Sequence, residues 1–279
     1  MPARYILTGR PLCGKTSLAA WLCRRLPQPV LGVRTLCTGR CAAGPLFSLQ
    51  NLATGALEPI SCEADGAVRA VPETFAAFGV QALRAARESG APTVLVDEIG
   101  RFERDCAPYL AELQALLDGP ATVVAVVKKE DLPHLNALRA RSGAVQLDLD
   151  AEPPEAIRAR LAPALPAPLH ASAPVRLYRA GKCFGPGPLQ LLELVARTGS
   201  LRTAAAAMGM AYSKAWGMLN ELESQWGFAM VARRPGGAGG GGSLLTEPAW
   251  DLIRRYRALQ WACDRAAQDA FAQQFGGMQ

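Results

Sequence analysis

The stretch Gly9-Arg10-Pro11-Leu12-Cys13-Gly14-Lys15-Thr16 decides the fold of the first half of the chain. An apolar run, Tyr5-Ile6-Leu7, precedes it, and a helix-forming segment, residues 17–22, follows it. The order strand, glycine loop, Gly-Lys-Thr and helix is that of a phosphate-binding loop. The alternative is a glycine turn that matches the pattern by chance, but the strand and the helix stand where the phosphate-binding interpretation requires them.

The residue types in this loop suit a nucleoside triphosphate. Gly9 and Gly14 let the backbone fold tightly, so that successive N–H groups point at phosphate oxygens. Lys15 supplies a positive charge for the outer phosphates, and the Thr16 hydroxyl can hold Mg²⁺. A helix that begins near Lys15 directs the positive end of its dipole at the same anion. The predicted nucleotide-binding residues are Gly9, Arg10, Pro11, Leu12, Cys13, Gly14, Lys15, Thr16 and Ser17.

A second nucleotide motif follows at residues 93–100, where a short β-rich apolar run ends in Asp97-Glu98-Ile99-Gly100. Asp97, at the end of the strand, can reach the Mg²⁺ shell, and Glu98 can orient and deprotonate an attacking water. We therefore predict Lys15 and Glu98 as catalytic residues, and Thr16 and Asp97 as metal-binding residues. The alternative is a buried strand with a polar end, and the neighbouring phosphate loop favours the catalytic interpretation.

Size and composition suit two domains in one cytoplasmic chain. The chain has 279 residues, of which 50% are hydrophobic, so each of two domains can bury a core. It shows no signal-peptide layout and no apolar run of membrane-spanning length, so we expect no membrane partner. The eight cysteines are scattered, and Cys37 and Cys41 form the one close pair, without an evident second half of a zinc site.

Charge is distributed unevenly between the two halves. Residues 1–165 hold 18 Lys/Arg and 17 Asp/Glu, a net charge of +1, whereas residues 166–279 hold 12 and 7, a net charge of +5. A basic second half indicates an anionic partner, most simply nucleic acid.

Strand and helix patterns alternate through the first half. Helices are expected at residues 72–89, 107–118, 132–140 and 154–161, and strands at 30–33, 46–52, 93–100, 121–127 and 144–149. Such alternation predicts an α/β domain with a parallel sheet covered by helices on both faces. Ligands bind such sheets at the carboxyl ends of the strands. Lys128 and Lys129 end one strand, where one of them could face phosphate, but a solvated charge pair is the favoured interpretation.

At this point the sequence resembles the small P-loop nucleoside-triphosphatases that carry a DEIG motif. The matching residues are Thr8 to Pro11, Gly14-Lys15-Thr16, and Asp97 to Gly100 with Glu103. The resemblance implies a kinase-like α/β fold over most of residues 1–162 and slow, Mg²⁺-dependent hydrolysis of ATP or GTP. The sequence departs from that family after Val127, where Lys128-Lys129-Glu130 replaces the usual His/Arg.

The second half predicts a helix-turn-helix with a wing. After a proline- and alanine-rich linker, helices are expected at residues 187–197, 201–208 and 213–226, with Ser200 and Ser213 as caps. The basic, glycine-rich segment 233–243 between two strand-like runs reads as the wing. The alternative to a DNA-binding helix-turn-helix is an alanine-rich packing unit of three helices. The alternative to a wing at the glycines is a flexible linker. The predicted DNA-binding residues are Arg202, Thr203, Tyr212, Ser213, Lys214, Arg233 and Arg234.

Residues 182–260 resemble the N-terminal DNA-binding domain of ModE-type molybdate-responsive regulators. The glycine block 236–242 leading to Leu245-Thr246 is the most specific match, and it separates this group from LysR-type regulators. The resemblance implies a homodimer on double-stranded DNA that uses one long helix, residues 247–275. No segment resembles the molybdate-binding domain, so direct molybdate sensing is not expected.

These observations predict a domain of residues 1–165, a linker of residues 166–178 and a DNA-binding domain of residues 179–279. The leading hypothesis is a cytoplasmic transcriptional regulator, linked to molybdenum metabolism, whose DNA binding depends on nucleotide. The alternative is a nucleoside-triphosphatase or small-molecule kinase of molybdenum cofactor metabolism, in which the winged helix contacts protein.

Overall fold

The computed structural model describes residues 3–233 and 242–276. By their internal contacts the residues form two compact units. The first comprises Met1–Leu36 and Phe47–Leu169, and the second comprises Cys37–Leu46 and His170–Gln279. Among the described residues, no helix combines the length and the apolar character that crossing a membrane requires.

A seven-stranded sheet with the strand order β4-β3-β2-β7-β8-β1-β9 organises the first unit, and the adjoining ends of its strands β2 and β3, within Cys37–Leu46, are counted with the second unit. Its strands are β1 (Arg4–Thr8), β2 (Val30–Cys41), β3 (Gly44–Asn51), β4 (Leu57–Pro59), β7 (Thr93–Ile99), β8 (Thr122–Val127) and β9 (Val145–Asp148). Strands β2, β7, β8, β1 and β9 pair in parallel, as predicted. The edge strand β4 runs antiparallel to β3, so the sheet is mostly rather than wholly parallel.

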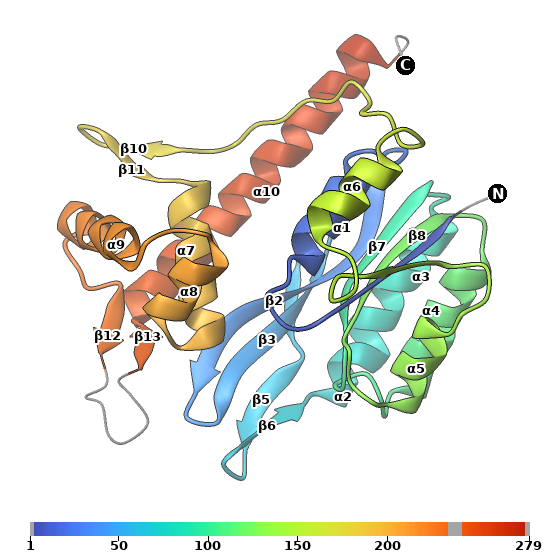
Figure 1. Cartoon of the computed structure of the whole chain (residues 1–279), viewed down its shortest axis with the longest axis horizontal. Coiled ribbons are helices and arrows are strands. Elements are labelled where there is room, and N and C mark those ends of the chain that lie inside the picture. Colours follow the sequence, from blue (N-terminus) through green and yellow to red (C-terminus); the bar gives the residue numbers. More distant parts are fainter. Residues whose placement is uncertain (1–2, 234–241, 277–279) are drawn as a thin grey trace. The chain divides into compact units, whose positions relative to one another are not determined.

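Alternation along the strands explains why helices cover both faces of this sheet. On β1, Ile6 packs into one core cluster while Tyr5 and Leu7 pack into the other. The first cluster includes residues of α3 (Val80–Glu88), α4 (Ala107–Asp118) and α5 (Pro133–Arg139), and the second includes α1 (Lys15–Cys23) and α6 (Pro154–Leu161) (Figure 1). Strands buried on both faces must be apolar at nearly every position, as the run from Val123 to Val127 is.

A few elements between β4 and β7 were not predicted from the sequence. Strands β5 (Ser61–Ala64) and β6 (Ala67–Ala70) form a separate hairpin. The predicted helix 72–89 is divided into α2 (Pro72–Thr74), a π-helical turn (Phe75–Gly79) and α3. Within that turn, Gly79 packs against the ring of Tyr109, where an added Cβ would lie 2.9 Å from two ring carbons. The close approach of the ring explains a glycine at this position.

The second unit is mainly helical. Its elements from residue 170 onward are β10 (Leu177–Tyr178), β11 (Lys182–Phe184), α7 (Pro186–Thr198), α8 (Leu201–Ala207), α9 (Tyr212–Trp226), β12 (Val231–Arg233), β13 (Ser243–Leu245) and α10 (Glu247–Phe275). Gly199 ends α7 with a φ of 69°, a left-handed conformation that favours glycine. Ser200 then caps α8, since its side chain accepts the Thr203 N–H at 3.2 Å. Strands β12 and β13 pair as a short antiparallel hairpin in the place predicted for a wing.

One predicted helix cap is wrong. Helix α9 begins at Tyr212 with Ala211 as its N-cap, and no side chain caps it. Ser213 lies inside the first turn, so its hydroxyl is not at the position from which a serine caps a helix. Thr246 does cap α10, where its hydroxyl accepts the Ala249 N–H at 3.3 Å.

Candidate functional site

The loop between β1 and α1 takes the shape that phosphate binding requires. Gly9 has a φ of +145° and Gly14 a φ of +98°, conformations that residues with a Cβ rarely adopt. Gly14 is the N-cap residue of α1, so the free N–H groups of that helix begin directly after it. Arg10, Pro11 and Leu12 are exposed in the loop, whereas Cys13 is half-buried, and Thr16 and Ser17 are exposed in the first turn of α1.

Lys15 and Glu98 come together although they are far apart in the sequence. The Lys15 side chain is only 8% exposed, and its ammonium donates to the carbonyl oxygens of Gly9 and Arg10, both at 2.9 Å. The same Nζ lies 3.8 Å from Oε1 of Glu98. The two predicted catalytic residues therefore meet at the phosphate end of the loop.

The two predicted metal ligands also meet. Asp97 is 3% exposed near the carboxyl end of β7, and its Oδ1 accepts the Thr16 hydroxyl at 3.3 Å. Hydroxyl and carboxylate oxygens are the hard donors that Mg²⁺ prefers. The donor set therefore fits the cation that the sequence predicts.

Asp150 is a residue of this loop region that the sequence reasoning missed. Its carboxylate oxygens accept the Arg10 N–H at 3.0 and 3.2 Å. That N–H, and then the ammonium of Lys129, lowers the pKa of Asp150 below its ordinary value. Lys129 pairs with Asp148 and Asp150 on the surface, where it is 43% exposed. No local motif indicates Asp150, because the contact joins residues 140 positions apart.

The adjacent Lys128 is placed differently, and here the interpretation of a solvated charge pair is wrong. Its ammonium lies 5.9 Å from the ring centroid of Phe47 and 6.0 Å from that of Phe102, within the range of a cation–π contact. An added Cβ at Gly100 would lie 2.9 Å from Cδ of Lys128. Lys128 thus runs across Gly100 of the DEIG segment rather than into solvent.

Lys128 lines a small cavity beside Glu98. The cavity has a volume of about 20 Å³ and is lined by Thr35, Phe47, Ile60, Glu98, Gly100, Phe102, Glu103 and Lys128. Glu103 is 2% exposed and accepts the Gly100 N–H at 2.9 Å. Burial raises the pKa of Glu103 to about 7. Thr35, Glu103 and Lys128 therefore lie around the predicted catalytic residue Glu98. Of these three, Glu103 was indicated by the sequence only as part of the family motif.

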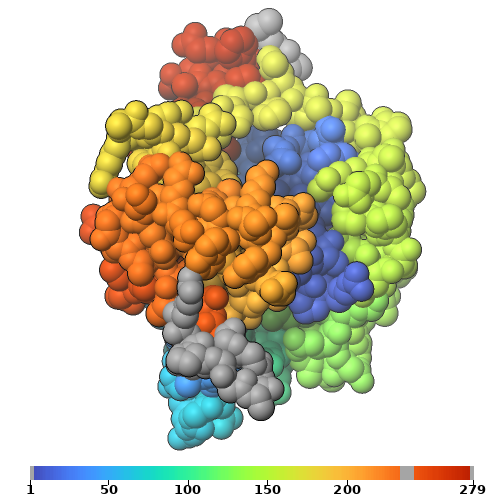
Figure 2. All heavy atoms as spheres, turned by 60° about the vertical axis from the view of Figure 1, so that its left-hand side comes forward, coloured from blue at the N-terminus to red at the C-terminus, as the bar shows by residue number. Residues whose placement is uncertain are grey.

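In the second unit, the predicted DNA-contacting residues gather at the start of α8 and α9. Arg202, Thr203, Tyr212, Ser213 and Lys214 are all exposed, and the two helices form part of the surface that Figure 2 turns toward the viewer. The Arg202 guanidinium lies 5.0 Å from the Tyr212 ring centroid, and that ring stacks on Trp216 at 6.4 Å. The first turns of two helices thus present one surface, with a positive charge held against it.

The two wing arginines cannot be placed in the same way. Arg233 ends β12, opposite Ser243 of β13, but its side chain lies outside the described residues. Arg234 and most of the glycine block also lie outside them.

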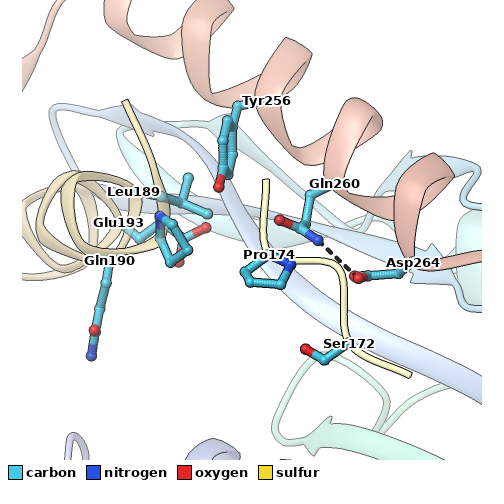
Figure 3. A pocket seen from close by; sticks show the side chains of 9 residues that line it. Ser172, Pro174, Leu189, Gln190, Glu193, Tyr256, Gln260 and Asp264 are labelled. Atoms are coloured by element: carbon cyan, nitrogen blue, oxygen red, sulfur yellow. Dashed lines mark hydrogen bonds between the residues drawn. The ribbon is translucent and has the colours of Figure 1, made fainter. Parts of the chain in front are cut away.

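A larger pocket, of about 320 Å³, lies in the same unit (Figure 3). Tyr256, Gln260 and Asp264 of α10 face Leu189 and Glu193 of α7 and the extended segment 172–174. Both of its carboxylates have internal partners: Glu193 pairs with Arg257 at 2.8 Å, and Asp264 accepts the Gln260 amide at 2.8 Å. Gln260 also donates a hydrogen bond to the Ala173 carbonyl and accepts one from the Val175 N–H. The pocket therefore lies where this extended segment is hydrogen-bonded to α10.

Comparison with protein families finds a different family model for each half of the chain. A family model described as "NTPase" matches residues 4–161, more than half of the chain, and the chain therefore belongs to this NTPase family. A P-loop NTPase fold implies nucleotide binding, usually with Mg²⁺. A second model, described as "Bacterial regulatory helix-turn-helix protein, lysR family", matches residues 187–249. A helix-turn-helix domain implies DNA as a binding partner. That this domain belongs with ModE-type rather than LysR-type regulators stays a prediction.

Curated relatives match part of the chain. The chain is 35% identical over 86 residues to the molybdenum-pterin-binding protein MopB of Rhodobacter capsulatus, a match that covers 31% of this chain and 32% of the relative. It is 36% identical over 74 residues to the DNA-binding transcriptional dual regulator ModE of Escherichia coli K12, covering 26% and 28%. The chain thus spans about a third of the length of these relatives.

Two solved structures are similar to part of the chain. THEP1 from Aquifex aeolicus is 23% identical with a TM-score of 0.47, over 58% of this chain and 99% of that one. A human cancer-related nucleoside triphosphatase is 20% identical with a TM-score of 0.44, over 58% and 94%.

Proposed function

We propose that this chain is a transcriptional regulator whose DNA binding depends on ATP or GTP. The observation that carries the proposal is one chain with two anion-binding regions. Lys15, Thr16, Asp97 and Glu98 converge in a unit of the NTPase family. Exposed Arg202 and Lys214 begin the helices of a helix-turn-helix. We assign residues 1–165 to the nucleotide domain, 166–178 to the linker and 179–279 to the DNA-binding domain.

In the nucleotide domain, the backbone N–H groups between Gly9 and Ser17 bind the phosphates, and Lys15 neutralises the outer ones. Thr16 and Asp97 would hold Mg²⁺, which when bound would draw electron density from the phosphate oxygens. Glu98 orients a water and accepts its proton, which gives slow hydrolysis to a nucleoside diphosphate and phosphate.

In the DNA-binding domain, α9 enters the major groove of double-stranded DNA. Tyr212, Ser213 and Lys214 lie in its first turn, where recognition helices contact base edges. Arg202 and Thr203, at the start of α8, contact backbone phosphates. Arg233 and Arg234 of the β12–β13 wing contact the flanking backbone.

The apolar pattern of Trp250, Ile253, Tyr256 and Leu259 along α10 suggests a face that packs on a second copy of the chain, but the first three side chains are buried within the chain itself. Leu259 and Phe275 are each 42% exposed, and apolar side chains at such positions suit pairing with a second copy of the chain. Similarity to the ModE and MopB proteins supports regulated genes of molybdenum metabolism. A regulator of this kind acts in the cytoplasm, where the DNA is.

A gel-shift titration of the full chain on its own upstream DNA tests the proposal. It is run without nucleotide and with Mg·ATP or Mg·GTP, and we expect the apparent Kd for DNA to change with nucleotide. No shift under any condition would contradict it. Steady nucleotide turnover without DNA binding would instead favour the alternative, an enzyme of molybdenum cofactor metabolism whose helix-turn-helix contacts protein.

A further inference from the structure

The cavity beside Glu98 is large enough for one water molecule. Its volume of about 20 Å³ exceeds the roughly 10–15 Å³ that one water needs. Its lining includes the apolar side chains of Phe47, Ile60 and Phe102. Thr35, Glu98 and Lys128 supply polar atoms to the same lining. A single water with polar partners on several sides is the occupant that fits.

The cavity lies close to the predicted phosphate-binding loop. Glu98, one of its walls, approaches within 3.8 Å of the Lys15 ammonium. Lys15 is the residue that meets the outer phosphates in loops of this kind. The cavity therefore adjoins the end of the loop at which the transferred phosphoryl group would lie.

Lys128 is held in this cavity by its surroundings. Its N–H donates to the Ile99 carbonyl at 2.9 Å, which fixes its backbone beside the DEIG segment. Its side chain crosses Gly100 and ends over the rings of Phe47 and Phe102. Within residues 3–233 and 242–276, no carboxylate forms a salt bridge with its ammonium. Burial raises the pKa of the neighbouring Glu103, and the charge of Lys128 opposes that rise. A half-buried ammonium interacts with developing negative charge more strongly than one in water.

We infer that the cavity holds the attacking water and that Lys128 is a further catalytic residue, which contacts the transferring phosphoryl group. This inference rests on the proposed hydrolysis. The water oxygen forms a bond to the γ-phosphorus, and the bond between that phosphorus and the bridging oxygen breaks. The nucleoside diphosphate leaves with the electron pair, and the proton of the water passes by way of Glu98 to the solvent or the phosphate product.

The sequence provides a matched control in the next residue. Lys129 carries the same charge, but it is exposed and paired with Asp148 and Asp150 on the surface. The experiment measures inorganic phosphate and nucleoside diphosphate released from Mg·ATP and Mg·GTP by the full-length wild type, K128M and K129M. Equilibrium binding of a fluorescent ATP analogue is measured on the same samples.

We expect K128M to lower kcat by about 10²-fold or more, as removal of one electrostatic stabiliser does, with nucleotide affinity changed by less than about threefold. K129M should keep kcat within about threefold of wild type, because exposed pairs contribute little. Unchanged analogue binding by K128M shows that the variant is folded. A K128M enzyme as active as wild type would overturn this inference alone. No phosphate release by the wild type would overturn the proposed hydrolysis together with it.

Discussion

The two proposed anion-binding regions of this chain are built in opposite ways. In the first unit the key side chains are buried, with Lys15 8% and Asp97 3% exposed, and their positions follow from a strand end and two left-handed glycines. In the second unit Arg202, Tyr212 and Lys214 are exposed at helix starts. Charges in a buried site interact strongly, while exposed charges are screened by water and salt. One region should thus depend on a few irreplaceable groups, and the other on many weak contacts.

The largest expected effect falls on the buried region. Replacing Glu98 with Gln removes the group that accepts the proton of the water, so turnover of Mg·ATP should fall by about 10²–10⁴-fold. Nucleotide affinity should change little, since Lys15 and the loop N–H groups remain. Phosphate release and equilibrium nucleotide binding measure the two properties. Loss of affinity with turnover preserved per bound nucleotide would contradict the assigned role.

The second largest expected effect is on stability, and it depends on how far burial raises the pKa of Glu103. Its folded-state pKa of about 7 lies above its ordinary value of 4.5, so the folded chain holds this proton more tightly. The resulting stability is fully present below about pH 4.5 and is lost as the pH rises to about 7, a total of roughly 3 kcal/mol. Glutamine keeps an oxygen for the Gly100 N–H and carries no charge.

The free energy of unfolding of wild type and E103Q in urea, at about pH 5 and about pH 8, measures this effect. We expect E103Q to gain stability relative to wild type as the pH rises. Parallel pH profiles of the two proteins would show that the buried carboxyl does not titrate as described.

The exposed region should respond more weakly and through salt. Arg202→Ala should reduce the slope of log Kd for DNA against log salt concentration by about 1, because Arg202 is assigned to a backbone phosphate. Lys214→Ala, assigned to base edges, should weaken binding to the specific site by about 1–3 kcal/mol. Arg254→Ala, on α10 and paired with Glu247 and Asp251, serves as the control of equal charge. A slope for Arg202→Ala equal to that of Arg254→Ala, together with unchanged specific binding by Lys214→Ala, would remove α8 and α9 from the DNA surface.

The smallest effect separates two serines of the second unit. Ser200→Ala should destabilise the chain by about 1 kcal/mol, because the Thr203 N–H loses its cap. Ser213→Ala should change stability by less than about 0.5 kcal/mol, since Ala211 is the N-cap of α9. Thermal unfolding of both variants measures the difference. A larger loss for S213A would restore Ser213 as a structural residue.

Much of the first unit could be predicted because its signals are local. A glycine loop between strand and helix, and acids at a strand end, place Lys15, Thr16, Asp97 and Glu98 from sequence alone. The contacts of Asp150 with Arg10 and of Lys128 with Phe47 join distant segments, and nothing in the local pattern marks them. The pattern also treated Lys128 and Lys129 as equivalent, whereas packing against two rings separates them.

In the second unit, helix boundaries followed from apolar spacing, but only one of the two predicted serine caps, Ser200, is confirmed. Ser200 and Ser213 both precede helical patterns, and only Ser200 has the extended backbone, with a ψ of 119°, from which its hydroxyl reaches the Thr203 N–H. Which exposed side chains meet DNA is a further step, because exposure places no constraint that a sequence pattern could reveal. The stack of Arg202 on Tyr212 is set by the crossing of two helices.

The carboxylate of Asp150 has a consequence for dissecting this molecule. It receives the N–H of Arg10 from near the other end of the first unit, and β9 just before it pairs with β1. Ile157 of α6 shares a core cluster with Leu18 and Leu22 of α1. A fragment that stopped after β8 would therefore retain every residue of the loop motif but lose what holds the loop in shape. The shortest piece worth testing for independent nucleotide binding extends at least to Leu161, the last residue of α6.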